Sequence, residues 1–437
     1  MNNLRKLIWI YLWLLIFEGA VRKWTIHVLD APLLVIRDPL VMWIYFQAWR
    51  HRLTFNNAFF MPNLVLAVAT AILATLFGSG NMLVTIYGLR TDYLQIPLIF
   101  LIPQILNRED VIAIGRALLY ASIPIAVLMV LQFRSSPDGL LNKGALETHY
   151  GTVRPSGPFS FISGPVAFFP LVSAFLFLGY IQPRTYKIGL LAAVTCATLL
   201  AASCSGSRSF LVLVGLVAVA AILSVVMRGK GGMGIMVAAA LIGLAILVLS
   251  FTSVAQEGTE QLGERLEFTA ANGEDASGFV ARFVNTMLAP LEGLSDVPVF
   301  GNGLGIGTNA AAGMLTGDRE FIGPEDEWGR LIFECGPIFG LLLCIFRLAL
   351  TVAVAWNAYR AFQRDNILPM LIFSACGLLI LNGQWGVPTT LGFAIFGAGL
   401  TLAACVEPAE EDEEDHEEHH DHAEDESDHS QVADTSS

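Results

Sequence analysis

The stretch that decides the fold runs from Phe210 to Val254 and reads FLVLVGLVAVAAILSVVMRGKGGMGIMVAAALIGLAILVLSFTSV. It holds two apolar runs, 210–227 and 233–254, and each is close to the roughly 20 residues that a helix needs to cross a bilayer. The short connection between them carries Arg228 and Lys230. Because backbone polar groups in lipid must be satisfied within each segment, the runs predict membrane-spanning helices and argue against a barrel.

The composition of the whole chain agrees with this pattern. Of its 437 residues, 54% are hydrophobic and 14% are charged, and the mean hydropathy is +0.61. An ordinary soluble domain carries about a quarter of its residues as charged side chains, so that class is excluded. The predicted fold is an all-α polytopic membrane protein with about twelve transmembrane helices, near 6–21, 32–48, 59–78, 91–106, 111–133, 162–181, 186–203, 210–227, 233–254, 331–356, 368–386 and 388–406.

The net charge of -13 is concentrated at one end of the chain. Of the 38 acidic residues, 15 fall in 407–437, so that 1–406 holds 23 acidic and 25 basic residues. We therefore expect a near-neutral helical bundle over 1–406 and a disordered, acidic, His-rich tail over 407–437. His-rich tracts can bind zinc or nickel, but a solvated polyanion is the favoured interpretation of the tail, and no metal site is expected.

The distribution of Lys and Arg sets the orientation, because cytoplasmic loops retain more of these residues. With the N-terminus inside, eleven basic residues fall in the short cytoplasmic loops and seven on the opposite side. Both termini are therefore predicted to be cytoplasmic. The six cysteines lie in or beside apolar runs without a C-x-x-C pair, so neither a disulfide framework nor a zinc site is indicated.

Two segments on the predicted outer side are longer than a connection needs to be. The first covers 134–161, and the second, between the ninth and tenth predicted helices, covers 255–330. Within the second, GFVARFVNTML (278–288) has the spacing of a short amphipathic helix. Long loops held by a rigid scaffold are where active sites concentrate.

Three outer arginines are candidates for holding an anion. Arg208 lies in CSGSRS (204–209), where small residues free the backbone N–H groups that begin the next helix. Arg282 lies on the amphipathic run, and Arg154 lies in VRPSGPFS (153–160). The structural alternatives are that these arginines extend along the apolar surface to reach the interface, or that they are solvated surface charges. An arginine donates two parallel hydrogen bonds, so the three together could hold the diphosphate of a lipid-linked donor.

Three consecutive carboxylates, Glu325, Asp326 and Glu327, come directly before the tenth apolar run. Negative charge at the start of a helix complements the helix dipole, and on the residues alone this structural interpretation is favoured. The functional alternative is a general base within reach of a sugar hydroxyl, with a pKa raised by partial burial.

In this order, the motifs resemble those of the O-antigen ligase and polymerase superfamily. Its members show an S-x-S-R element, a G-x-G-x-G turn, and a His-Asn pair followed by a Glu-x-Gly run into the next helix. The matching pieces here are Ser205-Gly206-Ser207-Arg208, the loop arginine Arg282, PVFGNGLG (298–305) and EDEWGRLIFECGPIFG (325–340).

The resemblance implies a GT-C-like glycosyltransferase of the bacterial inner membrane, with 255–330 as a large periplasmic loop. It implies polymerisation or ligation of polysaccharide units from an undecaprenyl diphosphate donor onto a glycan, lipid A core or protein acceptor. Arg208, Arg282 and Arg154 would bind the diphosphate, because fixed guanidinium groups stabilise a departing phosphate without a metal. No cofactor and no nucleic acid are implied, and the Gly301–Gly307 turn follows no Rossmann strand.

One departure from the family pattern concerns the base. Glu325 and Asp326 occupy the positions of the family's His-Asn pair. A carboxylate performs the same task in many glycosyl transfers, so Glu325 is the expected base, with Asp326 or Glu327 as substitutes and His149 as a remote option.

Two other functions are left open. A transporter or lipid-linked glycan flippase of similar helix number would show charges near the middle of its spans, where the sequence offers mainly Arg116 and Arg347. A catalytically inactive family member is the other alternative, since a fold does not guarantee an activity. The neighbours Arg37 and Asp38 are expected to form an ion pair within the bundle.

Overall fold

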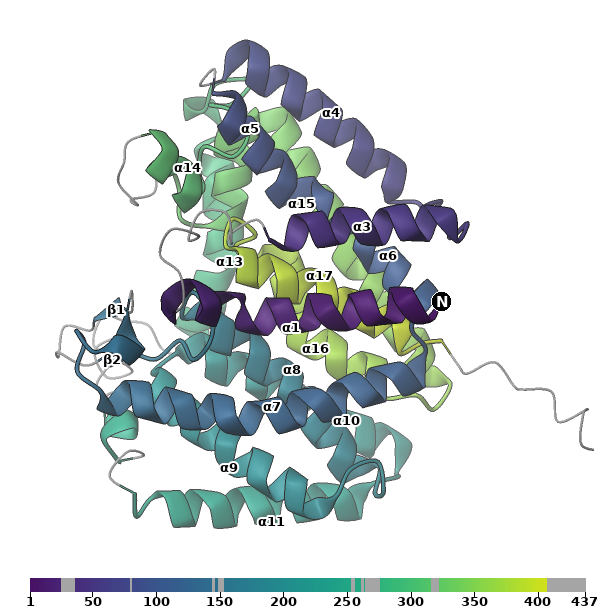
Figure 1. Ribbon diagram of the computed structural model, residues 1–437, viewed down its shortest axis with the longest axis vertical. Helices are drawn as coiled ribbons and strands as arrows, with labels where there is room; N and C mark the ends of the chain where they lie inside the picture. Colours follow the sequence, from purple (N-terminus) through teal and green to yellow (C-terminus); the bar gives the residue numbers. More distant parts are fainter. Residues whose placement is uncertain are drawn as a thin grey trace, which may run out of the picture.

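A computed structural model describes residues 1–24, 36–78, 81–143, 146–147, 153–252, 256–260, 263, 276–315 and 322–406, so the predicted tail and His149 lie outside the described residues. Within them the chain is all-α, apart from a two-stranded antiparallel sheet in which β1 (Leu146–Glu147) pairs with β2 (Val153–Arg154) (Figure 1). The α-helices are α1 (Asn2–Trp24), α3 (Arg37–Arg50), α4 (Phe60–Phe77), α5 (Met82–Leu89), α6 (Ile96–Ile105), α7 (Arg108–Arg134), α8 (Ser163–Ile181), α9 (Ile188–Ser205), α10 (Arg208–Arg228), α11 (Gly232–Leu249), α13 (Ala276–Glu292), α14 (Asn309–Leu315), α15 (Glu327–Gln363), α16 (Leu368–Asn382) and α17 (Pro388–Ala403).

Seven of the described helices are long and apolar enough to cross a membrane: α4, α7, α8, α9, α10, α11 and α15. α16 and α17 are shorter apolar helices. By helix length and hydropathy, the chain is a multi-pass membrane protein, as predicted. The amphipathic run 278–288 is helical, as expected, within α13.

Helix α8 forms the centre of the bundle. Nearly all of its residues are buried, and it packs against α7, α9, α10, α11, α16 and α17. By contrast, few residues of α4 and α11 are buried, and these apolar helices lie at opposite edges of the bundle (Figure 1). A helix that is apolar on all sides is buried in protein or faces lipid, so α8 belongs to the core and α4 and α11 to the lipid boundary.

The two ends of the bundle can be told apart by their contents. At one end Arg5 pairs with Asp110 at 3.4 Å, and Arg108 donates to Asn366 and Gln182 at 3.4 and 3.3 Å. This end holds the N-terminus and the end of α17, and in the predicted orientation it is cytoplasmic (Figure 1). The β1–β2 hairpin lies at the opposite end, called the outer end below.

The predicted helix near 91–106 differs from the structure. The helical segment begins earlier, at Met82, where the Asn81 side chain accepts hydrogen bonds from the N–H groups of Leu83 and Val84. It is then interrupted by a π-helical segment, η2 (Arg90–Leu94), before α6 continues. π-Helical turns are rare and are frequent at functional sites.

Candidate functional site

A tight turn positions Arg208 at the start of α10. Gly206 ends α9 in the left-handed conformation, with φ of 53°, which residues with a side chain rarely adopt. Ser207 caps α10, because its Oγ accepts a hydrogen bond from the N–H of Phe210 at 3.4 Å. Arg208 is half-buried in the first turn of α10, where the positive end of the helix dipole favours an anion.

The segment that carries Arg154 is fixed by side chains from two helices. On α7, the Gln132 amide accepts from the N–H of Gly157 at 2.8 Å and donates to its carbonyl at 3.2 Å. On α1, Lys23 donates to the hydroxyl of Ser156. Arg154 itself is half-buried on β2. Two basic side chains, on α1 and β2, are therefore held within one short stretch of the outer end.

The segments that carry Arg208 and Arg154 meet over the start of α8. Phe210 packs on Phe169 with 5.5 Å between ring centroids, and Phe159 packs on Phe168 with 5.6 Å. Both partner rings lie in the first two turns of α8. The structure therefore brings the N-terminus of α10 and the β2 segment to the same end of the bundle.

The third predicted arginine, Arg282, lies on α13, and its side chain is outside the described residues. α13 packs against α15. Asn382, at the end of α16, donates from Nδ2 to the hydroxyl of Thr286 at 3.3 Å. One helical turn therefore separates Arg282 from a contact at the outer end of α16.

The three predicted carboxylates have three different environments. Glu325 is exposed, and its backbone carbonyl accepts a hydrogen bond from Gln384 Nε2 at 2.6 Å. Asp326 caps α15, because its Oδ2 accepts from the N–H of Gly329 at 2.7 Å. Glu327 is buried among arginines. Asp326 thus has the structural role that the residues alone favoured, and Glu325 is the one that faces solvent.

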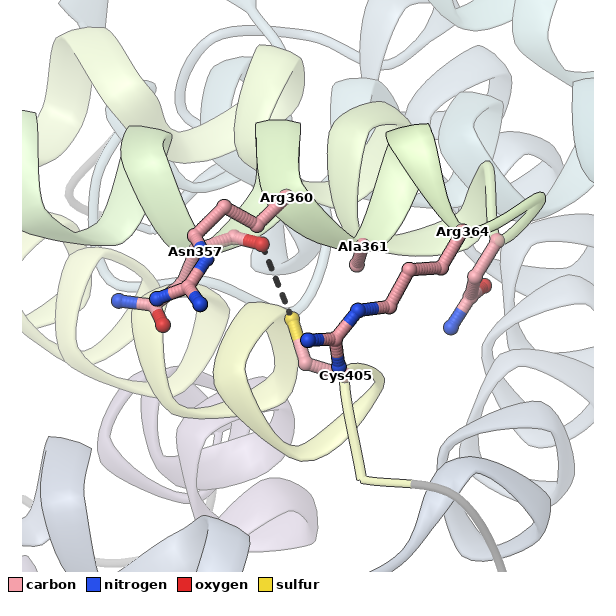
Figure 2. Close-up of a pocket in the computed structure, with 6 residues that line it drawn as sticks. Asn357, Arg360, Ala361, Arg364 and Cys405 are labelled. Atoms are coloured by element: carbon pink, nitrogen blue, oxygen red, sulfur yellow. Dashed lines mark hydrogen bonds between the residues drawn. The ribbon is translucent and has the colours of Figure 1, made fainter.

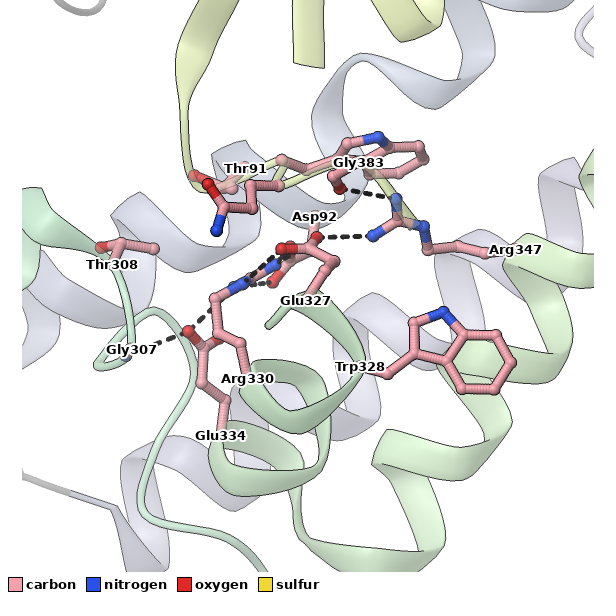
Figure 3. Close-up of polar contacts among 12 residues, drawn as sticks. Thr91, Asp92, Gly307, Thr308, Glu327, Trp328, Arg330, Glu334, Arg347 and Gly383 are labelled. Carbon is pink, nitrogen blue, oxygen red and sulfur yellow. Dashed lines mark hydrogen bonds and ion pairs between the residues drawn. The ribbon is translucent and has the colours of Figure 1, made fainter. Parts of the chain in front are cut away.

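Glu327 belongs to a buried network of five charged side chains (Figure 3). Arg330 is at its centre and donates to Asp92 at 2.6 Å, to Glu327 at 3.0 Å and to Glu334 at 2.8 Å. Arg347 donates to Glu327 at 2.5 Å. We call Asp92, Glu327, Arg330, Glu334 and Arg347 the buried charge network. With all groups ionised it holds three negative and two positive charges, and it ties α15 to the π-helical segment.

Arg347 completes the network from the interior of α15. It donates to the carbonyls of Ile380 at 3.0 Å and Gly383 at 2.9 Å, which end α16. Its guanidinium lies 3.9 Å from the centroid of the Trp385 ring. An arginine this deeply buried requires such partners, because an uncompensated charge in the bundle is strongly unfavourable.

The glycine turn of the family-like motif is held by Glu334. The carboxylate accepts hydrogen bonds from the N–H groups of Gly305 at 2.8 Å and Gly307 at 3.1 Å. Gly305 has φ of 88°, and a Cβ there would lie 2.4 Å from the carbonyl oxygen of Val84 on α5. Only glycine fits such a close approach. The turn therefore joins α5 to α15 and is a structural element of the bundle.

A kink in α15 receives the same turn. Gly336 has φ of 77° inside the helix, and Pro337 follows it. A Cβ at Gly336 would lie 2.2 Å from the carbonyl oxygen of Val299. The kink interrupts the helical hydrogen bonds, and the N–H groups of Asn302 and Gly303 donate to the freed carbonyls of Phe333 and Glu334 at 3.0 and 3.1 Å.

The expected ion pair between Arg37 and Asp38 is wrong. Both residues form ion pairs with other partners: Arg37 donates to Glu18 at 2.9 Å in a buried pair, and Arg90 donates to Asp38 in a partly buried one. Adjacent residues on a helix point about 100° apart, so each side chain faces a different neighbour.

Arg116 and Arg347 are not the main charged residues within the bundle. Asp92, Arg330 and Glu334 are buried together with Arg347, whereas Arg116 is exposed on α7. The available signal was the spacing of Glu327, Arg330 and Glu334, which places them on one face of a helix. The π-helical segment contributes Asp92 to the buried charge network. Its neighbour Gln95 accepts a hydrogen bond from the Tyr11 hydroxyl at 2.8 Å.

Comparison with known proteins gives no assignment: no family model matches the chain, and no curated protein matches it. Within the described ranges, no group of three or more His, Cys, Asp or Glu could hold a metal ion. The geometry presents two chemical environments. One is a set of basic side chains at the outer end, and the other is the buried charge network, whose carboxylates are occupied by arginines.

Proposed function

We propose that the protein is a membrane glycosyltransferase that polymerises or ligates polysaccharide units from an undecaprenyl diphosphate donor at the periplasmic face of the inner membrane. The observation that carries the proposal is the position of Arg208, which lies in the first turn of α10 at the same end as Arg154. The positive end of a helix dipole and a guanidinium together form a strong site for a diphosphate. The acceptor is a glycan, lipid A core or protein.

Glu325 is the proposed base. It is exposed before α15, whereas Asp326 is engaged in capping and both oxygens of Glu327 accept from arginines. A base must reach the acceptor hydroxyl, so the exposed carboxylate is the suitable one. Arg208, Arg154 and Arg282 are assigned to the diphosphate, and no metal is required, because guanidinium groups compensate the charge of the leaving group.

The proposed topology has twelve crossings. α1, α3, α4, the broken helix from α5 to α6, α7, α8, α9, α10, α11, α15, α16 and α17 supply them. This order places the starts of α8, α10 and α17 at the outer end and both termini in the cytoplasm. It also leaves 255–330 as the large periplasmic loop of a GT-C-like enzyme, in which α13 carries Arg282.

The proposal is tested by transfer of a glycan from a synthetic undecaprenyl diphosphate donor by the purified protein. Arg208→Ala should abolish the transfer, whereas Arg116→Ala, a change of the same size at an exposed site on α7, should not. Full activity of the Arg208 variant would remove the assignment of the diphosphate site.

A transporter or lipid-linked glycan flippase is the second candidate. The observation that favours it is the interrupted helix at η2, whose Asp92 enters the buried charge network. Ionisable groups on broken helices mark the substrate paths of transporters. Substrate movement across proteoliposomes without any new glycosidic bond would favour this function. An inactive family member would show neither transfer nor movement.

A further inference from the structure

We propose that a basic pocket at the cytoplasmic end binds the phosphate of an anionic phospholipid headgroup. The pocket has a volume of about 350 Å³ and is lined by Asn357, Arg360, Ala361, Arg364, Asn366 and Cys405 (Figure 2). It lies where the end of α15 meets the residues that follow α17, on the face opposite the proposed glycosyl transfer. The inference depends on the membrane placement of the bundle and not on its catalytic function.

Two like charges on one helical face define the pocket. Arg360 and Arg364 are four residues apart on the last turn of α15 and its C-cap, so their side chains lie on the same side of the helix. Neither guanidinium forms a hydrogen bond or an ion pair with the residues that the structure describes. Like charges at this spacing repel, and an anion held between them removes the repulsion.

The carboxylates that form ion pairs at this end pair with basic residues outside the pocket. Asp365 lies 3.5 Å from Arg228 and 3.9 Å from Lys230, and Asp110 lies 3.4 Å from Arg5. The lining itself contains two arginines and no acidic residue. Among the described residues, the lining of the pocket therefore carries a net positive charge.

The walls of the pocket are held by hydrogen bonds that do not involve the arginines. The thiol of Cys405 donates to the carbonyl of Asn357 at 3.7 Å, and Asn366 Nδ2 donates to the carbonyl of Ala404 at 2.7 Å. These contacts fix the end of α17 against α15 and against the start of α16. The site is formed where three helix ends meet, and Arg360 and Arg364 are part of its lining.

Aromatic residues place the pocket at the depth of lipid phosphates. Trp356 and Tyr359 are 58% and 37% exposed on α15, with 5.9 Å between ring centroids. Trp356 lies about one turn before Arg360, and Tyr359 directly precedes it. Trp and Tyr are enriched at the headgroup boundary of membrane helices. Arg360 is therefore about 6 Å beyond Trp356 along the helix, and Arg364 is about 12 Å beyond it, which is the level of the phosphates. This depth favours a lipid headgroup as the occupant.

The test is native mass spectrometry of the full-length protein with phosphatidylglycerol and with phosphatidylcholine that has the same acyl chains. The wild type should retain phosphatidylglycerol preferentially, and each arginine removed should weaken this binding on the order of fivefold. The test variant is Arg360→Gln with Arg364→Gln. The control, Arg50→Gln with Lys187→Gln, removes two exposed charges from the same end outside the pocket.

Four results would overturn the proposal. One is equal retention of both lipids by the wild type, and another is an equal loss of binding in the control variant. If Glu407→Gln, Glu410→Gln and Glu411→Gln together create a lipid preference that the wild type lacks, the tail is the occupant instead. Displacement of phosphatidylglycerol by millimolar inorganic phosphate would assign the site to free phosphate. The variant Arg360→Lys with Arg364→Lys, which keeps the charge, should retain most of the binding and shows that the fold is intact.

Discussion

Arg330 of α15 donates to Asp92 of the π-helical segment at 2.6 Å, across 238 residues of sequence. This ion pair connects the two interrupted helices of the bundle, since η2 breaks the helix from α5 to α6 and Gly336 kinks α15. Glu327 and Glu334 accept from the same guanidinium. The network therefore fixes the outer part of α15 against the first half of the chain.

Removal of Arg330 should destabilise the protein severely. Arg330→Met would leave Asp92 and Glu334 buried without their cationic partner, and such a loss lowers the free energy of unfolding by about 3–5 kcal/mol. Thermal unfolding in detergent measures the effect. Arg116→Met is the control, because that arginine is exposed, and a loss of similar size in both variants would contradict the role of the network.

Replacement by alanine should change the stability of the protein in opposite directions at two glycines. Gly336→Ala combines a φ of 77° with a Cβ placed 2.2 Å from the carbonyl oxygen of Val299, so the melting temperature should fall sharply. Gly215→Ala on α10 meets no atom within 4 Å and should raise the free energy of unfolding by about 0.5–1 kcal/mol. Unfolding of the two variants under one condition makes the comparison, and a stable Gly336 variant would argue against the kink.

Substitutions of the adjacent residues Glu325 and Asp326 should affect different properties, glycan transfer at Glu325 and stability at Asp326. Asp326→Ala removes the cap of α15 and should lower the free energy of unfolding by about 1 kcal/mol, whereas Asp326→Asn preserves the cap. Glu325→Gln should change stability by less than about 0.5 kcal/mol and slow glycan transfer by about 10²- to 10⁴-fold. Unaltered transfer with glutamine at 325 would exclude this residue as the base.

Cys405 should react slowly with thiol reagents at neutral pH. Burial raises the pKa of its thiol from 9.0 to about 11, because the thiolate is disfavoured away from water. Since the thiolate is the reactive form, the alkylation rate of folded protein should increase about tenfold per pH unit up to about pH 10. Mass spectrometry of the peptide that contains Cys405 follows the reaction. A plateau near pH 9 would show that the residue is not packed against α15.

The sequence was sufficient to predict the apolar helices, because each span is decided locally by a long run of apolar residues. α10 begins two residues before the predicted run 210–227 and ends one residue after it. The cap at Ser207 and the cap at Asp326 follow from residue types that satisfy helical N–H groups. These features require no knowledge of the tertiary structure.

The partners of buried charges could not be predicted in the same way. The choice of Glu18 by Arg37, and of Asp92 by Arg330, depends on which helices pack together and not on nearness in sequence. The π-helical turn at Arg90–Leu94 likewise has no local signature, since its side chains contact three different helices, α3, α4 and α15. Arg208 and Arg154 could be nominated from their motifs, but their common position depends on how α8 packs.

The most direct measurement is the rate at which purified wild-type protein and Arg208→Ala transfer a glycan from a defined undecaprenyl diphosphate donor to an acceptor, followed by chromatography of the product. We predict transfer by the wild type and a loss of about 10²- to 10³-fold in the variant, with an unchanged melting temperature. The variant Arg208→Lys should be intermediate, because it keeps the charge and loses the paired hydrogen bonds. Equal rates for wild type and Arg208→Ala, or no transfer by a folded wild-type protein, would contradict the proposed glycosyltransferase function.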